Sequence, residues 1–107
     1  VTKVWNYTPA QAEKTKQDIA MFCKGKLQLV PRGHPVRVNM TFCLRRPKSV
    51  KRADHCVKPD LDNLVKLVLD ALTGIAWEDD AQIVALSADK YYSPHGEPGA
   101  IALEVLT

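Results

Sequence analysis

The chain has 107 residues, of which 46% are hydrophobic and 25% are charged, and its formal net charge at pH 7 is +3. This length favours a single domain over residues 1–107, and the balance of apolar and charged residues argues against a disordered chain. No apolar run approaches the ~20 residues that span a bilayer, and no signal-peptide pattern is present, so no membrane association is expected. Three cysteines without a C-x-x-C pair favour a reducing, cytoplasmic setting over a disulfide framework.

The first part of the chain predicts one short extended piece and one helix. Residues Val4–Tyr7 suit an extended conformation, and Thr8–Pro9 marks a helix start, because Thr can cap a helix and Pro suits its first position. The helix is expected to run to about Lys24 and to end at Gly25, since Gly is the residue type that most often terminates helices.

The middle of the chain predicts a strand followed by a long loop. From Val36 to Leu44 every second residue is apolar, which is the period of a strand with one buried face. From Arg45 to Pro59 no period is visible, and the segment contains two prolines. A loop of this length in so small a domain is often functional.

The second half predicts one helix and two strands. The helix covers Asp60–Thr73, because its apolar residues fall on one core-facing stripe and Gly74 follows them. Gln82–Tyr92 and Ala100–Leu106 predict two strands, which the intervening Pro- and Gly-rich turn would join into a hairpin. The predicted fold class is α+β, a small mixed β-sheet with two helices in the order (β)-α-β-α-β-β.

The charges are unevenly distributed along the chain. Between residues 44 and 58 there are six basic residues and one acid, whereas between residues 60 and 80 there are six acids and one base. A basic surface beside an acidic cluster suggests a polyanion held next to a metal ion, although a basic loop can also be a solvated surface. The candidates for phosphate contacts are Arg45, Arg46, Lys48, Lys51, Arg52 and Lys58.

Carboxylates at both ends of the acidic segment are candidate metal ligands. Asp60 and Asp62 start the predicted helix, and Lys66 lies one helical turn after Asp62. Because the chain turns back after the helix, Asp79 and Asp80 are expected to come near these acids. Mg²⁺ is typically held by a few carboxylates together with waters and a substrate phosphate. Each acid also has an ordinary alternative role, as a helix cap, a partner of the helix dipole or a turn residue.

These motifs resemble the RusA family of Holliday junction resolvases. The resemblance rests on residues 58–72, K-P-D-L-D-N-L-V-K-L-V-L-D-A-L, and on residues 75–84, I-A-W-E-D-D-A-Q-I-V. A D-x-D-N-x-x-K segment followed by W-x-D-D is far more specific than a lone pair of acids, and the order of the other elements agrees over essentially the whole chain. Relatives usually begin with an extra strand, so the resemblance also implies that an N-terminal strand is lacking here.

The resemblance implies a homodimeric, Mg²⁺-dependent endonuclease of DNA recombination and repair, with Mn²⁺ as a substitute ion. Such enzymes nick two opposed strands of four-way junction DNA symmetrically and need no small-molecule cofactor. In the family, the residues matching Asp60, Asp62 and Asp80 are catalytic metal-site acids, and the residue matching Lys66 is catalytic. Asp79 matches a neighbouring acid and is a weaker candidate.

Three other functions are compatible with the same residues. The first is a non-catalytic DNA-junction-binding protein on the same scaffold. The second is a structural or interaction protein whose acids only cap helices, which would keep Asp60 and Asp80 well apart. The third is a metal nuclease that acts on flaps or single strands rather than on four-way junctions.

Overall fold

The structure, a computed structural model, describes residues 2–7 and 12–107, so the predicted helix start at Thr8–Pro9 lies outside the described residues. It confirms the α+β class and the predicted order of elements, with a short 3₁₀ helix, η1, added before the third strand. None of the described helices is long and apolar enough to cross a membrane. The elements are β1 (Thr2–Tyr7), α1 (Ala12–Cys23), β2 (Val36–Leu44), α2 (Leu61–Leu72), η1 (Asp80–Gln82), β3 (Ile83–Tyr92) and β4 (Gly99–Leu106).

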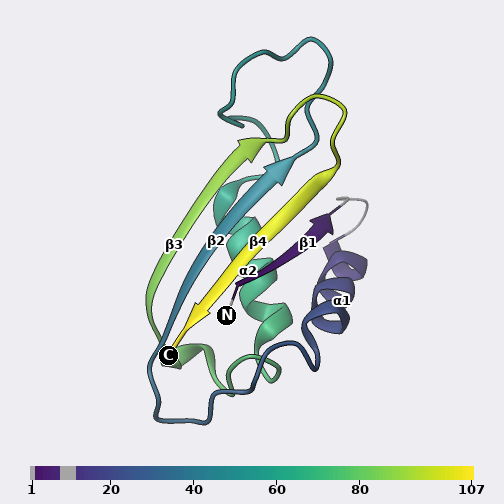
Figure 1. The fold of residues 1–107 in the computed structure, drawn as a ribbon. Helices are drawn as coiled ribbons and strands as arrows, with labels where there is room; N and C mark the ends of the chain where they lie inside the picture. The colour runs from purple at the N-terminus through teal and green to yellow at the C-terminus, as the bar shows by residue number, and fades with distance from the viewer. Residues whose placement is uncertain (1, 8–11) are drawn as a thin grey trace.

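The four strands form one mixed sheet in the order β1-β4-β2-β3, with β3 at one edge (Figure 1). β2 and β3 run parallel, so the chain must return along the sheet between them, and α2 makes this crossover. β4 is antiparallel to both β1 and β2. The predicted hairpin of β3 and β4 is therefore wrong. The segment after β3 passes the end of β2 and places β4 on the far side of that strand.

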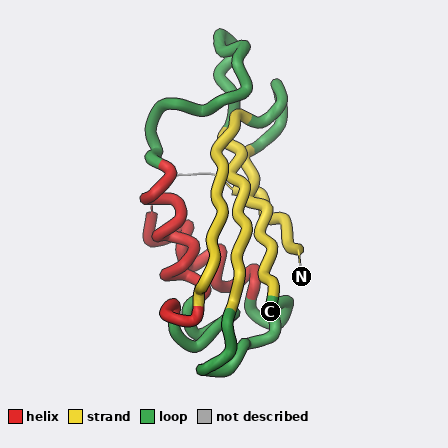
Figure 2. The backbone as a smooth tube through the Cα atoms, turned by 90° about the vertical axis from the view of Figure 1, so that its left-hand side faces the viewer, coloured by secondary structure: helices red, strands yellow, loops and turns green. Residues whose placement is uncertain are grey.

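Both helices cover one face of the sheet, and the hydrophobic core lies between the two layers (Figure 2). The alternation predicted for β2 is confirmed, because its apolar residues from Val36 to Leu44 are all buried while Arg37 and Asn39 are exposed. The predicted apolar stripe of α2 is also confirmed, since it supplies the buried residues Leu64, Val68, Ala71 and Leu72.

The two ends of α2 are defined by different features. At the start, the backbone of Asp60 is extended, and its carboxylate makes no capping hydrogen bond to the helix. At the end, Gly74 has a φ of 91°, a left-handed conformation that favours glycine and stops the helix. Trp77 follows as a fully buried core residue, and its indole N–H donates to the Thr73 hydroxyl at 3.2 Å.

The core contribution of α2 can be tested with Leu72, which has no exposed surface. A Leu72→Ala substitution should lower the free energy of unfolding by about 2–5 kcal/mol, because it removes buried methyl groups and leaves a cavity. Chemical denaturation measures this loss. The matched control is Leu29→Ala at a side chain that is 42% exposed, and equal losses in the two variants would contradict the assignment of the core.

Candidate active site

A groove of about 600 Å³ runs along the molecule between α2 and the edge strand β3. Its lining combines five apolar residues with three carboxylates and one ammonium group. Because β3 is an edge strand, no further strand of the sheet covers this side. The lining residues are Leu61, Asp62, Val65, Lys66, Leu69, Asp70, Asp80, Leu86 and Ala88.

The predicted site residues are distributed over the length of this groove. Asp62 and Lys66 lie at its α2 N-terminal end, in agreement with the predicted one-turn spacing. Asp80 starts η1 at the opposite end of the sheet, where β3 begins, and lies beside Leu69 in the last turns of α2 (Figure 1). Asp60 precedes α2, is not part of the groove lining, and forms an ion pair with Lys58 at 3.0 Å.

The expected convergence of the acids is not found within one chain. Asp62 and Asp70 are eight residues apart on α2, about 12 Å along the helix axis, and Asp80 lines the groove at the Asp70 end. Among the residues that the structure describes, no three carboxylate, histidine or cysteine side chains lie close enough together to hold a metal ion. Asp70, which the sequence indicates as an ordinary surface residue, lines the same groove as Asp62 and Asp80.

The donor chemistry at the start of α2 nevertheless fits a hard divalent cation. Asp60 and Asp62 flank the first helical residue; Asp60 is partly exposed and Asp62 is exposed. Mg²⁺ needs only one or two protein carboxylates when waters and substrate phosphate complete its coordination. Asp60 and Asp62 thus suit such an ion, and Asp80 lines the same groove as Asp62.

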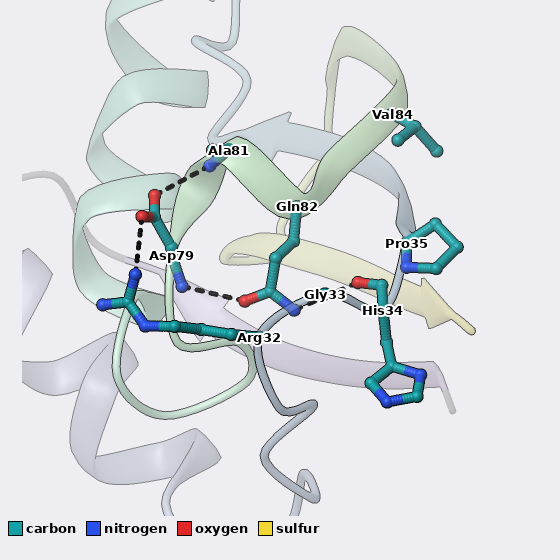
Figure 3. A pocket seen from close by; sticks show the side chains of 8 residues that line it. All are labelled: Arg32, Gly33, His34, Pro35, Asp79, Ala81, Gln82 and Val84. Atoms are coloured by element: carbon teal, nitrogen blue, oxygen red, sulfur yellow. Dashed lines mark hydrogen bonds and ion pairs between the residues drawn. The ribbon is translucent and has the colours of Figure 1, made fainter.

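Asp79 has a structural role that separates it from Asp80 (Figure 3). It caps η1, with the Ala81 N–H donating to Oδ1 at 3.0 Å, and Arg32 Nη1 donates to Oδ2 at 3.2 Å. The Ala81 N–H, followed by the Arg32 guanidinium, lowers the pKa of the Asp79 carboxyl below its usual range. Of the two adjacent acids, Asp79 therefore holds the turn, and Asp80 contributes to the groove.

Gln82 connects this turn to the loop before β2. Its side-chain oxygen accepts hydrogen bonds from the N–H groups of Glu78 and Asp79, at 3.0 and 2.9 Å. Its amide nitrogen donates to the carbonyls of Pro31 and His34, at 2.8 and 3.0 Å. Gln82 is buried, so both halves of its amide are used inside the protein. The D-x-x-Q spacing of a capping box was a sequence signal for the local contact with Asp79, but not for the contacts with Pro31 and His34.

The basic loop between β2 and α2 extends beyond the end of the sheet, at the end where α2 begins (Figure 1). Arg46 is half-buried, and its guanidinium donates to the carbonyls of Ser93 and Lys51 at 3.0 Å each. That side chain therefore shapes the loop. The other candidates for phosphate contacts are exposed: Arg45, Lys48, Lys51, Arg52 and Lys58.

The same loop is anchored to the last residues of β3. The Tyr92 N–H donates to the Ala53 carbonyl at 2.8 Å, and the buried His55 ring lies 4.6 Å from the Tyr92 ring. Burial, with a smaller effect of the nearby Lys90 ammonium, lowers the pKa of His55. The ammonium group of Lys90 donates to the carbonyls of Val57 and Pro59, at 2.8 and 2.7 Å. Sequence patterns had not singled out Lys90, because one lysine in a strand carries no motif.

The anchoring role of Gln82 predicts a loss of stability in Gln82→Leu. The substitution leaves two partly buried N–H groups and two partly buried carbonyls without their partner, which should cost about 1–3 kcal/mol in the free energy of unfolding. The exposed Gln28 provides the control, because Gln28→Leu should change stability by less than about 0.5 kcal/mol. Urea denaturation of both variants measures the difference, and an unaffected Gln82→Leu protein would refute this role.

The buried His55 predicts a pH dependence of stability. Its pKa is lowered in the folded protein, so the unfolded chain binds the proton more readily and stability falls as the pH drops below 6.5, the ordinary histidine value. His55→Phe should remove this part of the loss of stability between pH 7 and pH 5. His95→Phe, at an exposed position, should show the same loss of stability as the unmutated protein. Thermal unfolding at several pH values makes the comparison, and identical pH profiles for the two variants would contradict the assignment.

Comparison with known proteins agrees with the resemblance in the motifs. The chain matches the family Endodeoxyribonuclease RusA over residues 1–104. It is also similar to the Bacillus subtilis (strain 168) protein described as "Uncharacterized protein YqaN", with 31% identity over 103 residues, covering 85% of this chain and 72% of that protein. The match includes α2 with its acids, η1 and the basic loop. On these grounds the chain belongs to the RusA endodeoxyribonuclease family, whose members are hydrolases that act on DNA.

Proposed function

We propose that this protein is a divalent-metal-dependent endonuclease that resolves four-way DNA junctions by paired, symmetric nicks in DNA recombination and repair. Membership of the RusA family supports DNA cleavage as the activity. The observation that carries the proposal is the location of the basic loop, which lies at the end of the sheet where Asp60 and Asp62 start α2. A DNA backbone bound by this loop would bring a phosphodiester to those carboxylates.

The proposed roles follow from the groove. Asp60 and Asp62 would hold Mg²⁺, or Mn²⁺ in its place, and the family resemblance adds Asp80 as a third metal-site acid. When bound, the ion supplies polarisation of the phosphoryl oxygen and a water of lowered pKa. Lys66 presents an exposed ammonium on the groove rim and would donate to a phosphate or leaving oxygen.

The proposed DNA contacts divide the basic residues into two kinds. The exposed side chains Arg45, Lys48, Lys51 and Arg52, together with Lys58, would neutralise phosphates and give salt-dependent affinity without reading sequence. Arg46 uses its guanidinium on backbone carbonyls, so its contribution to affinity would come mainly from the shape of the loop.

A homodimer is part of the proposal, because each chain would supply one set of the proposed catalytic residues and a junction with two-fold symmetry needs two cuts. A C2 dimer presents two equal sites to two opposed strands. No small-molecule cofactor or membrane enters the proposed reaction. Cys43 and Cys56 carry free thiols, which is in keeping with the proposed cytoplasmic location.

The alternative function is a non-catalytic protein that binds DNA junctions through the basic loop. One observation favours it: among residues 2–7 and 12–107, no three carboxylate, histidine or cysteine side chains lie close enough together to hold a metal ion. Cleavage assays separate the two functions. If the unmutated protein binds four-way junctions but never cuts them with Mg²⁺ or Mn²⁺, the alternative is correct.

Substitution of Asp60 tests the proposed activity. Asp60→Asn should reduce junction cleavage by about 100-fold or more, which corresponds to ~2.7 kcal/mol of transition-state stabilisation. Junction binding should be retained or strengthened, because a negative charge facing DNA phosphates is removed. Labelled four-way, flap and linear DNA are incubated with and without Mg²⁺, and binding is measured without metal.

Asp89 provides the matched control for this test. It is exposed on β3 opposite Thr41 of β2, on the sheet face away from the helices, so Asp89→Asn should cut at the normal rate. Equal cleavage by the unmutated protein and Asp60→Asn would remove Asp60 from the catalytic site. Preference for flaps or linear DNA would contradict the junction specificity.

A further inference from the structure

Lys90 occupies an unusual position for a lysine in an edge strand. It pairs in register with the buried Phe42 of β2, so its side chain leaves the sheet on the face that the helices cover. The side chain is partly buried, and its ammonium group ends between two backbone carbonyls of the basic loop. The ammonium group of Lys90 is therefore engaged by the loop, at a partly exposed position.

The two carbonyls belong to the residues immediately before Asp60. The ammonium donates to Val57 O at 2.8 Å and to Pro59 O at 2.7 Å, so the chain from residue 57 to residue 59 curves around it. Lys58, between the two acceptors, extends outward and pairs with the Asp60 carboxylate at 3.0 Å. The Lys90 ammonium thus fixes the backbone that leads into Asp60, and the Lys58 ammonium contacts the Asp60 side chain.

The position of the Asp60 carboxylate depends on this backbone, because the side chain is not held by a hydrogen bond to the helix. The carboxylate makes no capping hydrogen bond, and only the Asp60 carbonyl enters the helix, by accepting from the Leu64 N–H at 3.2 Å. The other contacts of the loop with β3, at Ala53 and His55, lie five or more residues before Asp60. Lys90 is the anchor next to the proposed ligand.

We propose that Lys90 is a positioning residue, which holds residues 57–59 against β3 and so sets the Asp60 carboxylate for binding the divalent cation. The proposal rests on the proposed function of Asp60 and assigns to β3 a part in the site that lies outside the acidic motif. An ammonium group suits this task, because a charged donor binds two carbonyls strongly and leaves the carboxylate of Asp60 available for the ion.

The test compares Lys90→Met with the unmutated protein. Methionine keeps an unbranched apolar chain but loses the donors, so the 57–59 segment is released while the packing of the stem is largely retained. Mn²⁺ binding without DNA, measured by electron paramagnetic resonance of the free ion, should weaken about tenfold or more, the effect typical of losing a group that orients a metal ligand. The Mg²⁺ concentration for half-maximal junction cleavage should rise by a similar factor.

Two further variants separate positioning from other effects. Lys48→Met, in the exposed part of the basic loop, should weaken metal-free junction binding and leave Mn²⁺ binding unchanged, which is the reverse of Lys90→Met. Lys90→Arg keeps a charged donor group and should recover most of the Mn²⁺ affinity. If Lys90→Met does not fold in a thermal unfolding scan, Lys90→Gln, which keeps one polar donor group, replaces it under the same criteria.

The outcomes distinguish this proposal from the proposed function. If the unmutated protein binds Mn²⁺ and cuts junctions, and folded Lys90→Met matches it within about twofold in both, only the role of Lys90 is refuted. If the unmutated protein neither binds Mn²⁺ nor cuts DNA, the proposed function fails and the role of Lys90 is refuted with it. Weakened Mn²⁺ binding in Lys90→Met, with recovery in Lys90→Arg, supports the positioning role.

Discussion

The parallel pairing of β2 and β3 is the constraint on which the rest of the structure depends. Two neighbouring parallel strands require the chain to return along the full length of the sheet, and here α2 makes that return. The acidic segment contains this crossover, so it must begin at one end of the sheet and finish at the other. The start of α2 and the start of β3 therefore lie toward opposite ends of the sheet.

The same constraint explains which sequence predictions succeeded. The apolar period of β2 and the stripe of α2 depend on burial of a single face, which is a local pattern, and both elements form as predicted. The hairpin of β3 and β4 was wrong because a turn rich in Pro and Gly does not determine which strand is the neighbour. The expected grouping of three or more acids is not found among the described residues, for a related reason. A stop at Gly74 ends the helix, but it does not shorten the distance that the helix has already covered.

The residues that sequence reasoning missed make contacts that are distant along the chain. Gln82 reaches the loop at Pro31 and His34, and Lys90 reaches the carbonyls of Val57 and Pro59. Neither contact follows from propensity or periodicity, because each depends on which loop the fold places beside β3. For Arg46 the sequence predicted a different contact from the one that forms. Its charge suggested a phosphate contact, whereas its guanidinium donates to two backbone carbonyls.

The groove therefore has two ends that are held in place independently. At one end, Gln82 and the Arg32–Asp79 pair hold the turn that carries Asp80 against the loop before β2. At the other end, Lys90 holds the segment that leads into Asp60 against the last part of β3. Between them, α2 is fixed by its buried stripe, so its length sets the distance between the two ends. The relative position of the two ends is consequently a property of the crossover and its two anchors.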